Sequence, residues 1–132
     1  MTRHDAKSAG SLEALRSDPG RLPLSVVITT YNEEVNIADC LRSVLWADEI
    51  LLVDSFSTDR TLEYAREFPI QILEREYFGS AAQKNWSLDK VQHDWVLILD
   101  ADERVTEPLA REILTQLKQG PSAKGNYILP QN

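Results

Sequence analysis

Two aspartates that could hold a metal ion follow directly after an apolar segment. Asp100 and Asp102 flank Ala101 and precede Glu103, and residues 96–99, VLIL, have the composition of a buried strand. Carboxylates at positions i and i+2 of a turn can converge on one cation. Mg²⁺ and Mn²⁺ prefer such oxygen ligands and keep open positions for phosphate oxygens. The pattern predicts a cation site at the end of a strand, although the bare tripeptide is also common in solvated turns.

Two other apolar segments also end in clusters of polar side chains. Residues 29–33, TTYNE, follow one of them, and residues 54–59, DSFSTD, follow the other. The need for polar loops does not explain an aspartate at the ends of two buried segments with further carboxylates after each. In open α/β sheets, ligands bind beyond the carboxyl ends of the strands. We therefore expect the three clusters to contribute to one ligand site.

The periodicity of the apolar residues predicts the elements that position these clusters. A short β-branched run such as LSVVIT at residues 24–29 is typical of a strand that is buried on both faces. Ser57 or Thr58 is expected to cap the second helix, and Thr106 the fourth. Alternating strands and helices predict an α/β fold with a doubly wound, mostly parallel sheet. Strands are expected at residues 24–29, 49–53, 70–73, 93–99 and 125–130, and helices at residues 35–46, 57–68, 80–91 and 106–118.

The charge balance bears on the kind of ligand. The chain has 21 acidic and 14 basic side chains, a formal net charge of -7. Nucleic-acid binding needs a basic face, so this class of partner is not expected. A phosphate-bearing ligand would meet an acidic protein, and a divalent cation is one way to supply positive charge. Residues 1–22 are expected to be a flexible leader with a weak helix at residues 11–16, and Cys40 a small buried residue on a helix.

Four motifs, in order along the chain, resemble those of family 2 glycosyltransferases. Residues 24–34, LSVVITTYNEE, resemble the first strand and the Tyr-Asn-x-Glu turn of that family, and residues 53–61, VDSFSTDRT, resemble its second motif. QKN at residues 83–85 and WVLILDADE at residues 95–103 resemble the third and fourth motifs. The variants are most similar to those of bacterial lipopolysaccharide-core β-glucosyltransferases. The resemblance implies a Rossmann-like GT-A fold, the nucleotide-diphospho-sugar transferase fold, with residues 23–132 as its nucleotide-sugar-binding part.

The resemblance also implies roles for residues of the first two motifs. Thr29, Tyr31 and Glu33 would line a uridine pocket, with Tyr31 against the base. Asp54 would hold the base or the ribose. Ser55 stands where many relatives have a second aspartate, so that it accepts a hydrogen bond but brings no charge, and base recognition is expected to differ.

Further roles follow for the third and fourth motifs. Lys84 would lie near the donor as a cation, Asp100 would approach the ribose or the sugar, and Asp102 would ligate Mn²⁺ or Mg²⁺ on the diphosphate. One departure concerns Phe56, which replaces the usual glycine of the second motif. If that glycine has a positive φ, either Phe56 strains the turn or the turn has a different conformation here.

The resemblance implies an inverting enzyme that transfers a sugar from a UDP-sugar to a glycan or lipid-linked acceptor such as the lipopolysaccharide core. The similarity to the β-glucosyltransferases implies that this sugar is glucose. The general base of such enzymes comes from a second half, so it is expected beyond Asn132, in a part that this chain lacks. The chain is thus expected to be truncated and inactive alone, and to self-associate through an exposed sheet edge. A catalytically inactive nucleotide- and metal-binding fragment is the alternative. The implied location is the cytoplasm, with peripheral association at the inner face of the bacterial inner membrane left open.

Two other protein classes share parts of this pattern. Haloacid-dehalogenase phosphatases also have an Asp-x-Asp after a strand, but at the first strand and with a Thr or Val where Arg104 stands here. Receiver domains need paired acids after the first strand and a lysine after the fifth. Glu33 and Glu34 satisfy the first requirement, but no lysine follows residues 125–130. Both classes are therefore disfavoured.

Overall fold

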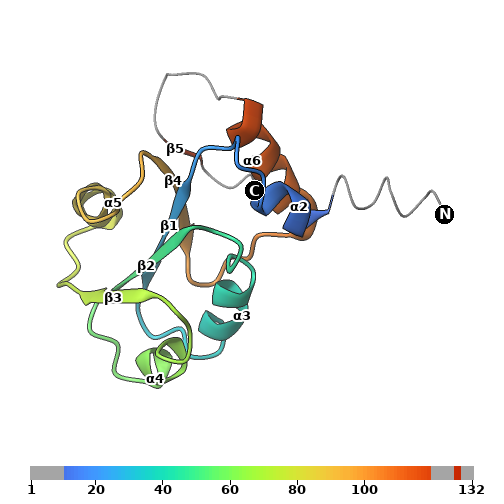
Figure 1. Cartoon of the computed structure of the whole chain (residues 1–132). Helices are drawn as coiled ribbons and strands as arrows, with labels where there is room; N and C mark the ends of the chain where they lie inside the picture. Colours follow the sequence, from blue (N-terminus) through green and yellow to red (C-terminus); the bar gives the residue numbers. More distant parts are fainter. Residues whose placement is uncertain (1–10, 120–126, 129–132) are drawn as a thin grey trace.

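The computed structural model describes residues 11–119 and 127–128, which form a parallel sheet with helices on both faces (Figure 1). The sheet has the strand order β3-β2-β1-β4-β5, and each described pair of neighbouring strands is parallel. The chain therefore winds outward from β1 in both directions, which confirms the predicted doubly wound sheet. The strands are β1 (Leu24–Thr30), β2 (Glu49–Asp54), β3 (Gln71–Glu74), β4 (Trp95–Asp100) and β5 (Tyr127–Ile128).

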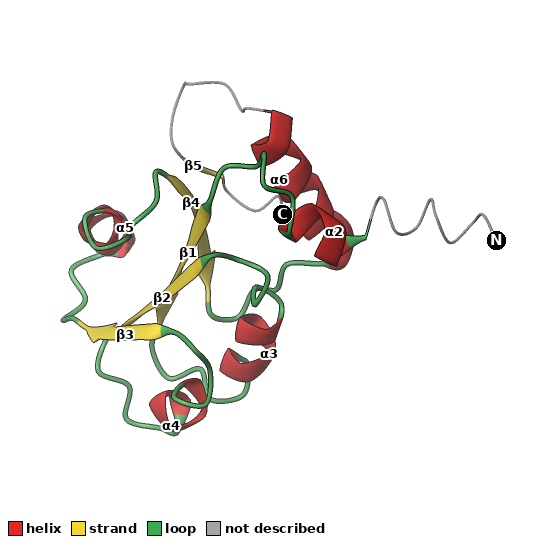
Figure 2. Cartoon of the chain, viewed as in Figure 1, coloured by secondary structure: helices red, strands yellow, loops and turns green. Residues whose placement is uncertain are grey.

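Two layers of helices cover the sheet because side chains along each strand alternate between its faces. Val26 and Ile28 belong to the larger apolar cluster, whereas Val27 between them belongs to a smaller one on the other face. Figure 2 shows α5 on one side of the sheet and α3 and α6 on the other. The helices are α2 (Leu12–Arg16), α3 (Ile37–Arg42), α4 (Thr61–Ala65), α5 (Ser80–Leu88) and α6 (Glu107–Gln119).

Three helices are shorter than predicted, and α3 shows one reason. The helix expected at residues 35–46 ends at Arg42. The Ser43 hydroxyl donates to the Cys40 carbonyl at 2.7 Å, and the Trp46 indole N–H donates to the Ser43 carbonyl at 2.7 Å. Side chains that hydrogen-bond to nearby carbonyls in this way offer the backbone an alternative to a continuing helix.

The capping prediction for the second helix is wrong. Helix α4 begins at Thr61, after the two proposed capping residues. The Ser57 hydroxyl instead donates to Asp54 Oδ1 at 2.6 Å, and the Thr58 N–H donates to Asn32 Oδ1 at 2.8 Å. Both hydroxyls also accept hydrogen bonds from Asn32 of the neighbouring loop, so they connect two loops rather than start a helix. The prediction for the fourth helix is confirmed, because the Leu109 N–H donates to the Thr106 hydroxyl at 3.3 Å.

The part of the predicted leader that the structure describes packs against the domain. The weak helix expected at residues 11–16 is present as α2, and its Leu12 and Leu15 contact the larger apolar cluster. Asp18 also forms an ion pair with Lys118 of α6 at 3.1 Å. Residues 1–10 and most of the strand expected at residues 125–130 lie outside the described residues. None of the described helices is both long and apolar enough to cross a membrane.

Candidate functional site

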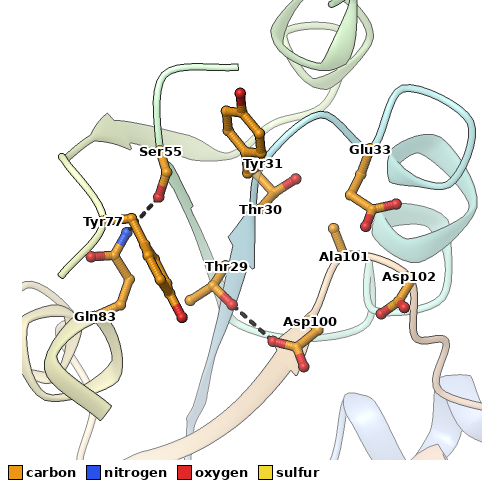
Figure 3. A pocket seen from close by; sticks show the side chains of 10 residues that line it. All are labelled: Thr29, Thr30, Tyr31, Glu33, Ser55, Tyr77, Gln83, Asp100, Ala101 and Asp102. Carbon is orange, nitrogen blue, oxygen red and sulfur yellow. Dashed lines mark hydrogen bonds between the residues drawn. The ribbon is translucent and has the colours of Figure 1, made fainter. Parts of the chain in front are cut away.

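A cavity of about 290 Å³ opens where β1, β2 and β4 reach their carboxyl ends (Figure 3). The parallel registers bring these ends together: Thr29 of β1 pairs with Asp100 of β4, and Thr30 pairs with Asp54 of β2. All three polar clusters of the sequence therefore reach the same edge of the sheet. The described residues that line the cavity are Thr29, Thr30, Tyr31, Glu33, Ser55, Tyr77, Gln83, Asp100, Ala101 and Asp102.

Most of the residues singled out from the sequence lie around this cavity, but two do not. Asp54 and Lys84 are absent from its described lining. Asp54 is fully buried, and its carboxylate accepts hydrogen bonds from both the Ser57 N–H and the Ser57 hydroxyl, at 2.8 and 2.6 Å. Lys84 lies on α5 directly after Gln83, which does line the cavity. The roles of Asp54 and Lys84 in donor binding remain predictions.

The turn after β4 presents its carboxylates in different states. Asp100 accepts a hydrogen bond from the Thr29 hydroxyl at 3.0 Å, which joins β4 to β1. Glu103 folds back and accepts from the Asp100 N–H at 2.8 Å, so this carboxylate is used within the turn. Asp102 is exposed, and within the described residues its carboxylate accepts no hydrogen bond. Asp102 is thus the carboxylate of this turn that is free to bind a ligand.

The carboxylate oxygens at the cavity suit a divalent cation that is also bound by the phosphate oxygens of a ligand. The described residues contain no group of three or more histidine, cysteine or acidic side chains arranged to hold a metal ion. Asp100 and Asp102 nevertheless both line the cavity. Mg²⁺-type cations are often bound by one or two carboxylates together with phosphate oxygens. Since the described lining contains three acidic side chains and no lysine or arginine, such a cation would supply the positive charge that phosphate needs.

Two neighbouring loops hold the cavity wall in place. Asn32 Oδ1 accepts from the N–H groups of Thr58 and Asp59, at 2.8 and 3.3 Å, and its own N–H donates to the Ser57 hydroxyl at 2.8 Å. Asn32 has a φ of 51°, a left-handed conformation that asparagine tolerates. Phe56 has a φ of 61°, which is unfavourable for a bulky side chain. The strain predicted for Phe56 is therefore confirmed.

A third loop, between β3 and α5, carries Tyr77, which lines the cavity. The Arg75 guanidinium lies 5.6 Å from the Phe78 ring centroid and 4.9 Å from that of Trp86, and it donates to the Ala82 carbonyl at 3.3 Å. Cation–π contacts of this kind fix an arginine between two aromatic rings. Gly79 ends the loop with a φ of 112°, which side chains rarely adopt. These contacts position the intervening Tyr77 at the cavity.

Cys40 lies beneath the acidic turn and is chemically quiet. Its thiol is buried, and Sγ lies 3.9 Å from the Asp100 carbonyl oxygen. Burial raises the pKa of the Cys40 thiol to about 12, so little thiolate forms at neutral pH. This confirms the prediction of a small buried residue on a helix, here α3.

Sequence reasoning assigned no individual role to four of the lining residues, namely Thr30, Tyr77, Gln83 and Ala101. A signal for Gln83 was present. It and Ser87 are the buried residues of α5 and stand four positions apart, on the side of the helix that faces the sheet. A glutamine at such a position needs hydrogen-bond partners, which marks it as a candidate. Tyr77 gave no comparable signal, because its place depends on the contacts of its loop.

The sequence matches a family model described as Glycosyl transferase family 2 over residues 25–129. It is 36% identical over 102 residues to the lipopolysaccharide core biosynthesis glycosyltransferase LpsC of Rhizobium meliloti, which covers 74% of this chain and 37% of that protein. It is also 36% identical over 91 residues to an uncharacterized glycosyltransferase of Rickettsia typhi, covering 68% of this chain and 31% of the relative. The chain thus spans about a third of the length of these relatives.

Solved structures with the same fold include a glucosyl- and a mannosyl-3-phosphoglycerate synthase. A glucosyl-3-phosphoglycerate synthase from Mycobacterium tuberculosis, in complex with Mn²⁺, UDP and phosphoglyceric acid, superposes with a TM-score of 0.63 at 26% identity. The match covers 75% of this chain and 39% of that one. Mannosyl-3-phosphoglycerate synthase from Rubrobacter xylanophilus has a TM-score of 0.66 at 23% identity, over 83% of this chain and 40% of the other, and it supports the fold alone.

Proposed function

Because this chain belongs to glycosyltransferase family 2, we propose that it forms the donor-binding part of an inverting transferase that uses a UDP-sugar. The sugar is glucose, and the acceptor is a glycan or lipid-linked glycan such as the lipopolysaccharide core. The relation to LpsC supports this acceptor class. The M. tuberculosis synthase, which is described with UDP and Mn²⁺, supports a nucleotide donor bound together with a divalent cation.

One observation carries the proposal: an exposed tyrosine and two carboxylates share one cavity whose described lining has no basic side chain. Tyr31 offers a face on which a base can stack. Asp100 and Asp102 offer oxygen ligands for Mn²⁺ or Mg²⁺ at the diphosphate. A cation held there would neutralise the charge that develops on the departing diphosphate.

The protein's own groups would orient the donor. Thr29 holds Asp100 through a 3.0 Å hydrogen bond, so one carboxylate is fixed while that of Asp102 stays free. Glu33 accepts from the Asn36 side chain at 2.9 Å at the start of α3, which keeps this acid at the cavity wall. We assign to Glu33 and Thr29 the sugar side of the nucleotide, and to Tyr31 and Ser55 the base side.

The alternative is that this chain binds nucleotide and metal without catalysis. The engagement of the nearby glutamates favours it, because Glu33 and Glu103 already accept hydrogen bonds within the protein. A general base must reach the acceptor hydroxyl within about 2.6–3.2 Å. Each of these hydrogen bonds occupies one carboxylate oxygen of its glutamate, and we propose that the general base comes from outside this cavity.

Two assays distinguish these functions. Titration with UDP-glucose and Mn²⁺ measures donor binding, and a transfer assay with lipopolysaccharide-core acceptors measures catalysis. We expect binding without acceptor-dependent turnover from this chain alone. Turnover that gives a β-linked product from the α-linked donor would support the inverting reaction and refute the fragment alternative. Absence of UDP binding would exclude both.

For the complete enzyme we propose a cytoplasmic location at the inner face of the bacterial inner membrane. This proposal follows the lipopolysaccharide-core acceptor, which supports peripheral association with the membrane. Fractionation of cells that produce the protein, before and after a high-salt wash, tests it. Recovery in the soluble fraction under all conditions would refute membrane association.

A further inference from the structure

An apolar slot shares its described lining residues with the cavity. Its described lining consists of Tyr31, Ser55 and Tyr77, and its volume is about 390 Å³. We call these three residues the aromatic slot. The tyrosines are more than half exposed, at 55% and 59%, although they come from different loops. Two aromatic faces with a hydroxyl between them suit a flat heterocycle that has polar groups along one edge.

Gln83 lines the adjoining cavity, contacts Ser55 of the aromatic slot, and has an unused hydrogen-bonding group. Its side chain is 1% exposed, and its Nε2 donates to Ser55 Oγ at 3.0 Å (Figure 3). Its Oε1 is buried and has no hydrogen-bond partner. Among the described residues the only other such side-chain atom is Thr30 Oγ1, and Thr30 also lines the cavity. Buried polar atoms are seldom left without a partner, so two of them at one cavity indicate a ligand that supplies the missing groups.

We infer that Gln83 and Ser55 together recognise the nucleobase edge of the donor within the aromatic slot. The Ser55 oxygen accepts from Gln83, which leaves the Ser55 hydroxyl hydrogen free to donate. Gln83 Oε1 is free to accept. A donor beside an acceptor complements the adjacent carbonyl and N–H of uracil, and opposes the amino group and bare nitrogen of cytosine. The inference rests on the proposed nucleotide donor.

This arrangement assigns base recognition to uncharged groups instead of the Asp54 carboxylate. Asp54 is fully buried, and both of its oxygens accept hydrogen bonds from Ser57. Ser55, the next residue, lines the aromatic slot and the cavity. The β2 loop thus directs a hydroxyl to the ligand and keeps its carboxylate for its own structure.

Calorimetric titration of the 132-residue chain with UDP and with CDP, each with Mn²⁺, tests the inference. Gln83→Met keeps the length of the side chain but removes both polar groups. We expect it to weaken UDP binding about tenfold, the worth of one buried hydrogen bond. It should also reduce the preference for UDP over CDP. Binding of Mn²⁺ with inorganic pyrophosphate, which has no base, should not change.

Two further variants keep the test decisive if Gln83→Met unfolds. Ser55→Ala removes the donating hydroxyl and should lower the UDP-to-CDP preference in the same way. Tyr77→Ala should weaken both nucleotides, whereas Val35→Ala should weaken neither, because the side chain of Val35 is exposed and lines neither the aromatic slot nor the cavity. Thermal melting identifies any variant that is not folded.

The outcomes separate this inference from the proposed function. If the wild-type chain binds no UDP, the proposed function itself is wrong. If it binds UDP but Gln83→Met and Ser55→Ala leave both affinity and base preference unchanged, base recognition lies elsewhere. A change of base preference in Asp54→Asn alone would return that role to the carboxylate and overturn the inference.

Discussion

Replacement of Asn32 tests whether the loops that carry Tyr31 and Ser55 are held together as the structure indicates. Asn32 Oδ1 accepts two backbone hydrogen bonds, from Thr58 and Asp59, and its Nδ2 donates to the Thr58 hydroxyl at 3.3 Å. Its backbone has a φ of 51°. Asn32→Ala removes the side-chain hydrogen bonds and puts a less tolerant residue in the left-handed region.

The expected cost combines these two effects. Net hydrogen bonds contribute about 0.5–1.5 kcal/mol each, and the low end applies because Asn32 is exposed. A left-handed conformation costs a residue such as alanine about 1 kcal/mol. Asn32→Ala should therefore lower the free energy of unfolding by about 2–3 kcal/mol. Asn32→Gly loses the same hydrogen bonds without the conformational cost, so its loss should be about 1 kcal/mol smaller.

Urea denaturation followed by circular dichroism measures these differences, and UDP titration follows the site. Asn32→Asp keeps the accepting oxygen and tolerates the left-handed backbone, so it serves as the matched control. Asn32→Ala should also weaken UDP binding, because Tyr31 precedes it in the same loop. Equal stability of Asn32→Ala and Asn32→Gly would refute the conformational argument. A loss below about 0.5 kcal/mol in both would refute the role of the loop hydrogen bonds.

Three further changes test other parts of the site and fold. Tyr31→Ala should weaken UDP binding by about 1–3 kcal/mol, as expected for one base stack, whereas Tyr31→Phe should not. An unchanged UDP affinity of Tyr31→Ala would show that Tyr31 does not stack on the base. Phe56→Asn should raise the free energy of unfolding by about 0.5–1 kcal/mol, seen as a higher urea midpoint, because asparagine tolerates a φ of 61° better and the half-exposed ring loses little packing. A lower midpoint would show that the ring makes an unrecognised contact. The chain should self-associate in light scattering, because β3 and β5 are the edges of the described sheet; a strict monomer would show that these edges are protected.

The sequence allowed the sheet and most of the cavity to be predicted, for a physical reason. Parallel strands bury both faces, so β1, β2 and β4 appear as continuous apolar runs, and each must place the residues after it at the same edge. Thr29, Tyr31, Ser55, Asp100 and Asp102 follow or end those runs, and they do line one cavity. Their proximity therefore follows from the topology.

What the sequence did not predict depends on side-chain partners. The hydroxyls of Ser57 and Thr58 suit a helix cap, but they instead accept hydrogen bonds from Asn32 of the neighbouring loop. Asp54 occupies the same kind of strand end as Asp100, yet it is buried and hydrogen-bonded to Ser57, whereas Asp100 is exposed. Tyr77 comes to the cavity through contacts that have no local pattern. Propensity and periodicity say little about these choices because the competing hydrogen bonds have similar energies.

Metal dependence of UDP binding tests the central claim, that the turn after β4 holds a divalent cation at the diphosphate of the donor. UDP affinity is measured by calorimetry in the presence of Mn²⁺ and in the presence of EDTA, for the wild-type chain, Asp102→Asn and Asp94→Ala. Asp94 is an exposed acid directly before the first residue of β4 and serves as the control. The wild type and Asp94→Ala should bind UDP at least about tenfold more tightly with Mn²⁺, and Asp102→Asn should lose most of that gain. Equal UDP affinity of the wild-type chain in Mn²⁺ and in EDTA would contradict the account.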